Sequence, residues 1–121
     1  MLKIGINGFG RIGRAIFRIN NENPSFIVGA INDIDSDVEN HAYLLKYDSI
    51  YGTLADKIIS DNAKRKMIIN NDEIKFYDKT CITEVPWEKH DVDIIIDSSG
   101  IYDNVVSSHN LIKNKKIKKI I

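Results

Sequence analysis

The chain has 121 residues, the size of one domain, and 43% of them are apolar, which suffices for an ordinary hydrophobic core. Its 17 basic and 17 acidic residues cancel, so net charge predicts affinity for neither nucleic acid nor a membrane surface. The single Cys81 excludes an internal disulfide and fits a reducing compartment, and no apolar run reaches the length of a bilayer span. Because no signal peptide is visible before the first predicted strand, we expect a cytoplasmic protein.

The first predicted elements frame a glycine-rich loop. Residues 2–6 are apolar at alternate positions, which predicts a strand. From position 12 onward apolar residues recur at helical spacing, which predicts a helix that begins inside the loop. The stretch between them reads Asn7-Gly8-Phe9-Gly10-Arg11-Ile12-Gly13-Arg14. A strand, Gly-x-Gly-x-x-Gly and a helix, in this order, are the fingerprint of a dinucleotide-binding domain.

Each glycine of this loop has a physical role. Gly8 allows the tight turn out of the strand, and Gly10 has no side chain to hold a pyrophosphate away from the backbone. Gly13 lets the helix pack close to the sheet. The helix N-terminus then offers unpaired N–H groups and the positive end of its dipole to the phosphates.

An acidic residue follows about twenty residues later, as the fingerprint requires. Residues 25–33 predict a buried parallel strand that closes with Asn32 and Asp33. A carboxylate at this place accepts hydrogen bonds from the adenosine ribose and repels a 2′-phosphate, so Asp33 favours NAD over NADP. The alternative is an ordinary turn aspartate after a buried strand. We prefer the cofactor interpretation because the glycine loop accompanies it.

The middle of the chain predicts a helix and then short strands. Ser36 or Asp35 has the chemistry of an N-cap for a helix over about residues 37–46. Turn residues at 70–72 indicate a hairpin. The β-rich segments are residues 57–60, 66–70 and 73–77. We expect these segments to form a small antiparallel insertion attached to the parallel sheet.

Cys81 lies in a β-rich segment, residues 80–83, that suggests a packed strand. A lone cysteine also allows a nucleophile, because a distant histidine can meet it in space. We prefer packing, since a free cysteine usually behaves as a small hydrophobic residue. Residues 85–90 predict a turn or a single-turn helix, with Pro86 at its start. No metal is expected, because short ligand spacing is missing among the histidines, which are His41, His90 and His109.

The last third predicts another buried strand over residues 91–97, which ends in Ser98-Ser99-Gly100. Small residues at the carboxyl end of a strand let a ligand approach, in the crevice where open α/β sheets bind. A helix from about Asp103 and a strand from Ile117 follow, and the lysines between them complement the helix dipole. Together these elements predict an α/β fold: a Rossmann-type doubly wound, mainly parallel sheet with a small antiparallel β insertion.

By these residues the chain resembles the N-terminal, NAD-binding part of phosphorylating glyceraldehyde-3-phosphate dehydrogenase. The blocks that carry the resemblance are Lys3–Arg14, Ile31–Asp33, Tyr43–Gly52 and Asp97–Tyr102. The third block is the most specific, because no general argument about nucleotide binding requires its Tyr47-Asp48-Ser49. The resemblance implies an enzyme of glycolysis that oxidises glyceraldehyde 3-phosphate with NAD and inorganic phosphate to an acyl phosphate.

The resemblance also implies a set of residues that bind NAD. Lys79 stands near the place where the family usually has an arginine, and Tyr102 matches an aromatic residue beside the adenine. Asp97 and Ser99 depart from the family's Glu-Ser-Thr-Gly segment but keep its chemistry. The implied cofactor-binding residues are Asn7, Gly8, Phe9, Gly10, Arg11, Ile12, Asn32, Asp33, Lys79, Ser98, Ser99, Gly100 and Tyr102.

The family's catalytic motif, Ser-Cys-Thr-Thr-Asn, does not occur in these 121 residues, and Cys81 has different neighbours. We therefore expect residues 1–121 to be an NAD-binding domain that is truncated at its C-terminal end and inactive alone. The implied partners are NAD, the missing catalytic domain and, for the full-length family, the other subunits of a homotetramer. Neither a membrane nor a nucleic acid is indicated.

Two alternatives stay open. In the first, the chain is a stand-alone nucleotide-binding module without catalysis, and it would use these same binding residues. It would also use them as the cofactor half of the similar erythrose-4-phosphate dehydrogenase, whose discriminating residues would lie in the absent half.

Overall fold

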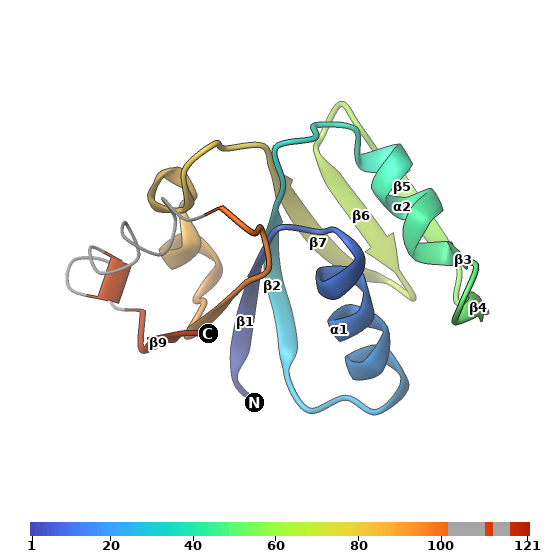
Figure 1. Ribbon diagram of the computed structural model, residues 1–121, viewed down its shortest axis with the longest axis horizontal. Helices are drawn as coiled ribbons and strands as arrows, with labels where there is room; N and C mark the ends of the chain where they lie inside the picture. The colour runs from blue at the N-terminus through green and yellow to red at the C-terminus, as the bar shows by residue number, and fades with distance from the viewer. Residues whose placement is uncertain (102–110, 113–116) are drawn as a thin grey trace.

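A seven-stranded sheet organises the part of the chain that the computed structural model describes, residues 1–101, 111–112 and 117–121 (Figure 1). Its strands are β1 (Lys3–Asn7), β2 (Ile27–Asn32), β5 (Ile58–Asp61), β6 (Lys66–Ile69), β7 (Asp72–Tyr77), β8 (Ile94–Asp97) and β9 (Lys119–Ile120). A separate small hairpin consists of β3 (Tyr47–Asp48) and β4 (Gly52–Thr53). The helices are α1 (Arg11–Glu22), α2 (Val38–Lys46) and the 3-10 helices η1 (Ile82–Glu84) and η2 (Trp87–His90).

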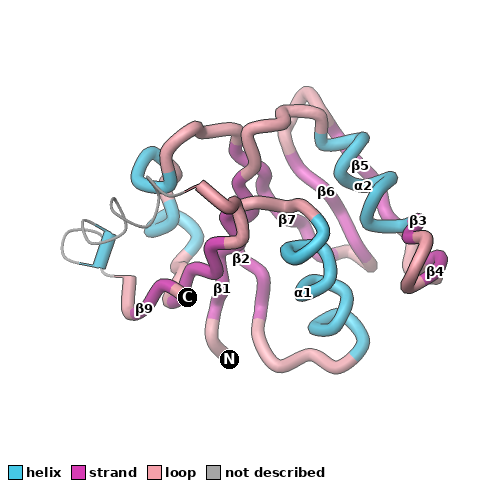
Figure 2. Tube along the Cα trace, viewed as in Figure 1, coloured by secondary structure: helices cyan, strands magenta, loops and turns pink. Residues whose placement is uncertain are grey.

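The strand order is β5-β6-β7-β2-β1-β8-β9. β1 pairs in parallel with both β2 and β8, and β7 and β9 continue the parallel pairing on either side. β6 is antiparallel to both of its neighbours, β5 and β7. The predicted fold class, a mainly parallel Rossmann-type sheet with a small antiparallel part, is therefore confirmed. The antiparallel strands extend the main sheet through the β2–β7 pair (Figure 2).

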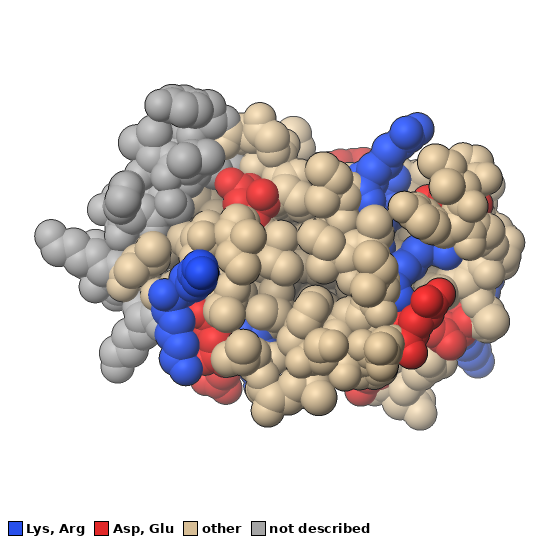
Figure 3. Space-filling view, turned by 60° about the horizontal axis from the view of Figure 1, so that its bottom comes forward, with Lys and Arg blue, Asp and Glu red and all other residues tan. Residues whose placement is uncertain are grey.

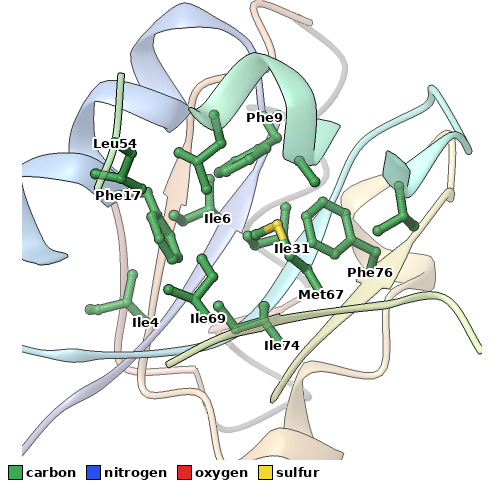
Figure 4. Close-up of a cluster of buried hydrophobic side chains, with 13 residues drawn as sticks. Ile4, Ile6, Phe9, Phe17, Ile31, Leu54, Met67, Ile69, Ile74 and Phe76 are labelled. Atoms are coloured by element: carbon green, nitrogen blue, oxygen red, sulfur yellow. The ribbon is translucent and has the colours of Figure 1, made fainter. Parts of the chain in front are cut away.

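Alternate residues of the central strands enter two separate cores. On the face covered by α1 and α2, one cluster of buried side chains includes Ile6, Ile31 and Phe76 (Figure 4). On the opposite face the other cluster includes Trp87 and Ile95. Burial on both faces explains why β2 and β8 are nearly continuous apolar runs rather than alternating ones.

The hairpin prediction is confirmed, whereas the predicted cap of α2 is wrong. Asn70 and Asn71 have φ of 49° and 76°, the left-handed conformation that a tight turn between β6 and β7 requires. The N-cap of α2 is Asp37, whose side chain accepts the backbone N–H of Asn40, and not Ser36 or Asp35. Asp37 has this position because Asp35 already accepts the N–H of Asp37 in an Asx turn, at 3.0 Å.

The predicted strand over residues 80–83 is also wrong. Cys81 precedes η1, and its carbonyl accepts the N–H of Glu84 at 3.0 Å. The indole N–H of the fully buried Trp87 donates to the carbonyl of Ile82 at 2.9 Å, which holds this turn against the second core. The short helix after Pro86 is confirmed as η2. The helix predicted from Asp103 lies mostly outside the described residues, and β9 confirms a strand after Ile117.

Arg18 joins α1 to the end of α2 and to the small hairpin. Its guanidinium is buried and donates to the carbonyls of Leu45, Lys46 and Gly52 at 2.6–3.0 Å. These carbonyls include groups at the C-terminal end of α2 that have no partner within the helix. Arg18 therefore fixes the position of the β3–β4 hairpin relative to α1.

Charged side chains are distributed over the surface in small groups of either sign. On the face that Figure 3 shows, blue and red side chains lie next to each other in small groups, and wide areas without charge separate these groups. No helix among the described residues is long and apolar enough to cross a membrane.

Candidate functional site

The carboxyl ends of β1, β2 and β8 meet at one edge of the sheet and form a cleft of about 230 Å³. β1 lies between β2 and β8. After β1 the chain forms β2 on one side of it, and only much later forms β8 on the other side. This is the point at which open α/β sheets bind ligands. The cleft is lined by Asn7, Gly8, Gly10, Asn32, Asp33, Ile34, Lys79, Thr80, Ser98, Ser99 and Ile101.

Two glycines allow close backbone contacts of the glycine loop. Gly8 lies against the segment that follows β8, and Gly13, in α1, lies against the carbonyl of Gly8. Gly8 has φ of +96°, and a Cβ there would lie 2.5 Å from the backbone nitrogen of Ser99. Its N–H donates to the carbonyl of Asn32 at 2.7 Å, which closes the turn out of β1. A Cβ on Gly13 would overlap the carbonyl oxygen of Gly8. Both glycines are therefore required by backbone packing, as predicted from the spacing.

Gly10 has a different environment, because a Cβ there would meet no atom of the described residues within 4 Å. It is the N-cap of α1 and provides no side-chain hydrogen bond to the first turn. The opening N–H groups of α1 are thus left for an anion, and the helix dipole favours negative charge at the same place. The open space at Gly10 is where a pyrophosphate fits.

Asp33 places a carboxylate at the end of β2 beside this open helix terminus. Its Oδ2 accepts the N–H of Phe9 at 2.7 Å, and its Oδ1 accepts the N–H of Asp35 at 2.9 Å. The side chain is 19% exposed. Since each carboxylate oxygen accepts more than one hydrogen bond, both oxygens keep capacity for two hydroxyl donors. This chemistry fits an adenosine ribose.

A chain of hydrogen bonds between two amide side chains and a carboxylate connects the three strand ends. The buried Asn32 donates to Oδ1 of Asn7 at 2.7 Å, and Asn7 donates to Oδ1 of Asp97 at 3.1 Å. Asn32 also donates to the carbonyl of Lys79 and accepts its N–H, at 3.0 and 2.8 Å. Asn7 and Asn32 thus hold β1, β2, β8 and the loop at Lys79 together below the cleft.

The segment after β8 forms the other wall. Ser98 donates from its hydroxyl to the carbonyl of Gly8 at 2.6 Å, and its N–H donates to the carbonyl of Asn7. Asp97 accepts the hydroxyl of Ser99 at 2.7 Å. Gly100 follows with φ of +72°, is exposed and lies outside the lining of the cleft.

The cleft brings together most of the predicted site residues, but not all of them. The ring of Phe9 is 1% exposed and packs in the first core, so only its backbone faces Asp33. Arg11 and Ile12 are exposed at the start of α1 and line a separate hollow toward the β3–β4 hairpin. Tyr102 lies outside the described residues. Contact between the cofactor and each of these residues stays a prediction.

Sequence reasoning missed Asp97 as a supporting residue of the cleft, and Ile34, Thr80 and Ile101 as lining residues. Asp97 has one available signal, because it closes a buried strand as Asp33 does. Cys81 lies outside this lining, with Sγ 3.0 Å from Oγ1 of Thr83. Among the described residues, no group of three or more His, Cys, Asp or Glu side chains is placed to hold a metal.

One pair of titratable groups lies behind the cleft. The carbonyl of Tyr77 accepts the N–H of Asp33 at 2.9 Å, and its hydroxyl lies 2.6 Å from Nε2 of His90. Burial lowers the pKa of His90 below its ordinary value of 6.5, and the charges of nearby lysines act in the same direction. Burial also raises the pKa of Tyr77. The tyrosine hydroxyl therefore shares this hydrogen bond with a neutral imidazole, and the tyrosine is the donor when the imidazole hydrogen is on Nδ1.

A glycine loop at a helix N-terminus, a carboxylate closing the next strand and a cleft at the switch point define a Rossmann-type dinucleotide-binding domain. Residues 2–105 match the family model described as glyceraldehyde 3-phosphate dehydrogenase, NAD binding domain. The chain belongs to this family, and its cofactor is NAD.

Individual relatives agree with the family match. The chain is 36% identical over 104 residues to a glyceraldehyde-3-phosphate dehydrogenase of Colletotrichum lindemuthianum, covering 86% of the chain and 30% of that protein. It is 40% identical over 100 residues to glyceraldehyde-3-phosphate dehydrogenase 1 of Bacillus cereus, covering 83% and 29%. A relative in Ajellomyces capsulatus is 35% identical over 121 residues, which are all of the chain and 35% of that protein. The chain spans about a third of the length of the curated relatives it matches.

Proposed function

We propose that the chain binds NAD with its adenosine ribose on Asp33 and its pyrophosphate on the N-terminus of α1. The observation that carries this proposal is the Asp33 carboxylate, fixed by the N–H of Phe9 beside the open space at Gly10. A ribose offers two hydroxyl donors to this carboxylate, and charge-assisted hydrogen bonds contribute roughly 1.5–3 kcal/mol each. The remaining cleft residues support the backbone that holds the Asp33 carboxylate and the first N–H groups of α1 in place.

The same carboxylate sets the proposed choice between NAD and NADP. A 2′-phosphate replaces one hydroxyl donor and brings negative charge next to the Asp33 carboxylate, which is repulsive at short range. The neighbouring Ile34 and Asp35 provide no cation, whereas Lys79 contributes a positive charge to the same cleft lining. We expect the repulsion at Asp33 to prevail over Lys79, because Asp33 faces the ribose directly.

Titration calorimetry with NAD and NADP tests this assignment. We expect the unaltered chain to prefer NAD by at least about tenfold, or 1.4 kcal/mol, and Asp33→Ala to narrow the preference by weakening NAD. Asp35→Asn is the matched control, because it removes a neighbouring charge and keeps a side-chain oxygen for the Asx turn. If the unaltered chain binds NADP as well as NAD, Asp33 does not contact the ribose.

We further propose that residues 1–121 are the NAD-binding domain of an oxidoreductase, with the catalytic residues in sequence outside them. The resemblance implies oxidation of an aldehyde by NAD with uptake of inorganic phosphate, giving an acyl phosphate, NADH and a proton. It also implies assembly with a catalytic domain and into a homotetramer. The relatives' name, glyceraldehyde-3-phosphate dehydrogenase, supports this proposal.

The chain alone is then expected to lack dehydrogenase activity. Ser-Cys-Thr-Thr-Asn is absent from its sequence, and Cys81 lies outside the cleft lining. An assay of NADH formation with glyceraldehyde 3-phosphate, NAD and phosphate should give no rate above the protein-free reaction. Turnover that disappears in Cys81→Ser would identify Cys81 as a nucleophile and overturn this expectation.

A further inference from the structure

His41 is a buried polar residue that the hydrophobic core alone does not explain. It lies in α2 and is 4% exposed. Its ring stacks on Phe76, with centroids 5.6 Å apart and planes at 23°, and meets the edge of Phe9 at 6.0 Å. A leucine or methionine would fill such a space without polar atoms, whereas an imidazole adds two nitrogen atoms that each need a hydrogen-bond partner.

Within the part of the chain that the structure describes, one of these nitrogen atoms has a hydrogen-bond partner and the other has none. Nε2 lies 2.9 Å from the carbonyl oxygen of Asp35, and because a carbonyl only accepts, Nε2 carries the hydrogen. In the neutral ring Nδ1 is then an acceptor, and it is buried without a hydrogen-bond partner among the described residues. An orphan acceptor destabilises the folded chain. Polar residues retained at such a cost are expected at functional sites.

The bond from His41 leads directly to the carboxylate of the cleft. Asp35, whose carbonyl His41 holds, donates its own N–H to Oδ1 of Asp33 at 2.9 Å. The N–H of Phe9 holds Oδ2 of the same carboxylate from the glycine loop. Nε2 of His41 also lies 3.9 Å from Oδ1 of Asp33. The carboxylate is thus fixed from two sides, and His41 supports the side that faces α2.

We propose that His41 is a positioning residue that fixes the orientation of the Asp33 carboxylate and thereby sets the preference for NAD over NADP. This inference rests on the proposed function, in which Asp33 accepts both ribose hydroxyls. Without the Nε2–H donor, the backbone of Asp35 lies in an exposed loop with one hydrogen bond fewer, so the Asp35 N–H that orients Oδ1 of Asp33 is held less firmly. A rotated carboxylate would accept one hydroxyl well and the other poorly.

Two variants of His41 separate positioning from packing. His41→Met keeps an apolar side chain that adapts to the space and removes the donor. His41→Gln keeps an N–H donor that is able to reach the carbonyl of Asp35. We expect His41→Met to weaken NAD binding by about tenfold and NADP binding by much less, so that the NAD/NADP ratio falls, whereas His41→Gln largely restores the ratio.

A control for general loosening of α2 is Val38→Ala. Val38 is fully buried in the same helix and belongs to the same core as Phe9 and Phe76. The Val38→Ala substitution should lower the free energy of unfolding and leave the NAD/NADP affinity ratio unchanged. A ratio that falls as far in Val38→Ala as in His41→Met, or that His41→Gln does not restore, would mean that His41 only packs.

Amide hydrogen exchange provides a readout without any nucleotide. In the unaltered chain the N–H groups of Asp35 and Phe9 should both be protected, and His41→Met should release Asp35 far more than Phe9. An unprotected Asp35 N–H in the unaltered chain would overturn the inference without the need for a variant. If the unaltered chain shows no preference for NAD, the proposed function fails; if the preference exists and His41→Met keeps it, only the role of His41 fails.

Discussion

The hydrogen bond between Tyr77 and His90 makes the stability of the chain dependent on pH. His90 makes this bond as a neutral ring, and burial lowers its pKa below 6.5 in the folded state. As the pH falls below about 6.5, the unfolded chain takes up a proton on this residue before the folded chain does. The contribution of His90 to the free energy of unfolding is therefore complete above that pH and decreases below it.

Urea unfolding between about pH 8 and about pH 5.5 measures this dependence. In His90→Gln, the amide oxygen still accepts from the Tyr77 hydroxyl and no longer titrates, so the loss of stability in acid should be smaller than in the unaltered chain. Tyr77→Phe is the control, because it removes the hydroxyl and leaves the half-buried His90 in place. If the free energy of unfolding depends on pH in the same way in His90→Gln and in the unaltered chain, His90 has the same pKa in the folded and the unfolded state.

At the residue scale, the groups that are predictable from the sequence are those whose chemistry is local in the chain. Gly8, Gly10 and Gly13 have a fixed spacing, and Asp33 follows at the expected distance. The network through Asn7, Asn32 and Asp97 depends on the register that places these residues side by side on three strands, and no local pattern encodes it. For the same reason His41 is indistinguishable in sequence from any helical histidine.

At the scale of the element, the N-terminus of α1 offers a direct test of the phosphate site through two neighbouring glycines. Gly10 has φ of −83°, which any residue adopts, and a Cβ there meets open space. Gly10→Ala should change the free energy of unfolding by less than about 1 kcal/mol and weaken NAD binding by at least about tenfold, because the methyl group occupies the space of the pyrophosphate.

Gly13→Ala is the contrasting substitution in the same helix. Its Cβ would overlap the backbone carbonyl of Gly8, so α1 must move away from the sheet. We expect a loss of about 1–3 kcal/mol of stability together with weaker NAD binding. Urea unfolding and calorimetry on both variants measure the two effects. Unchanged NAD affinity in Gly10→Ala would place the pyrophosphate elsewhere.

Element positions were predictable where one signal dominates. The buried strands have long apolar runs, and the β6–β7 turn has two consecutive asparagines, which tolerate the left-handed conformation. The cap of α2 was ambiguous because Asp35, Ser36 and Asp37 all have suitable side chains. The turn at Cys81 was missed because the buried Trp87, which holds it through the carbonyl of Ile82, acts from another segment.

At the scale of the whole molecule, the strand order determines when folding is able to finish. β1 lies in the interior of the sheet, and its register partner in β8 comes 90 residues later, as the pair Asn7 and Asp97 shows. On a ribosome that adds about 5–20 residues per second, the β8-facing edge of β1 waits about 5–20 s for its partner. During that interval an apolar strand has an open edge, which is a template for aggregation.

This delay predicts a protease-sensitive nascent chain. Ribosome-bound chains stalled after β2 or β7 has emerged should be digested readily, and resistance should appear only after β8 has emerged. By then Trp87 and Val92 of the second core are able to pack against Gly5. Resistance already present once β2 has emerged would contradict this order. Because β1 lies in the interior of the sheet, its open edge has to be kept from aggregation until β8 has been synthesised.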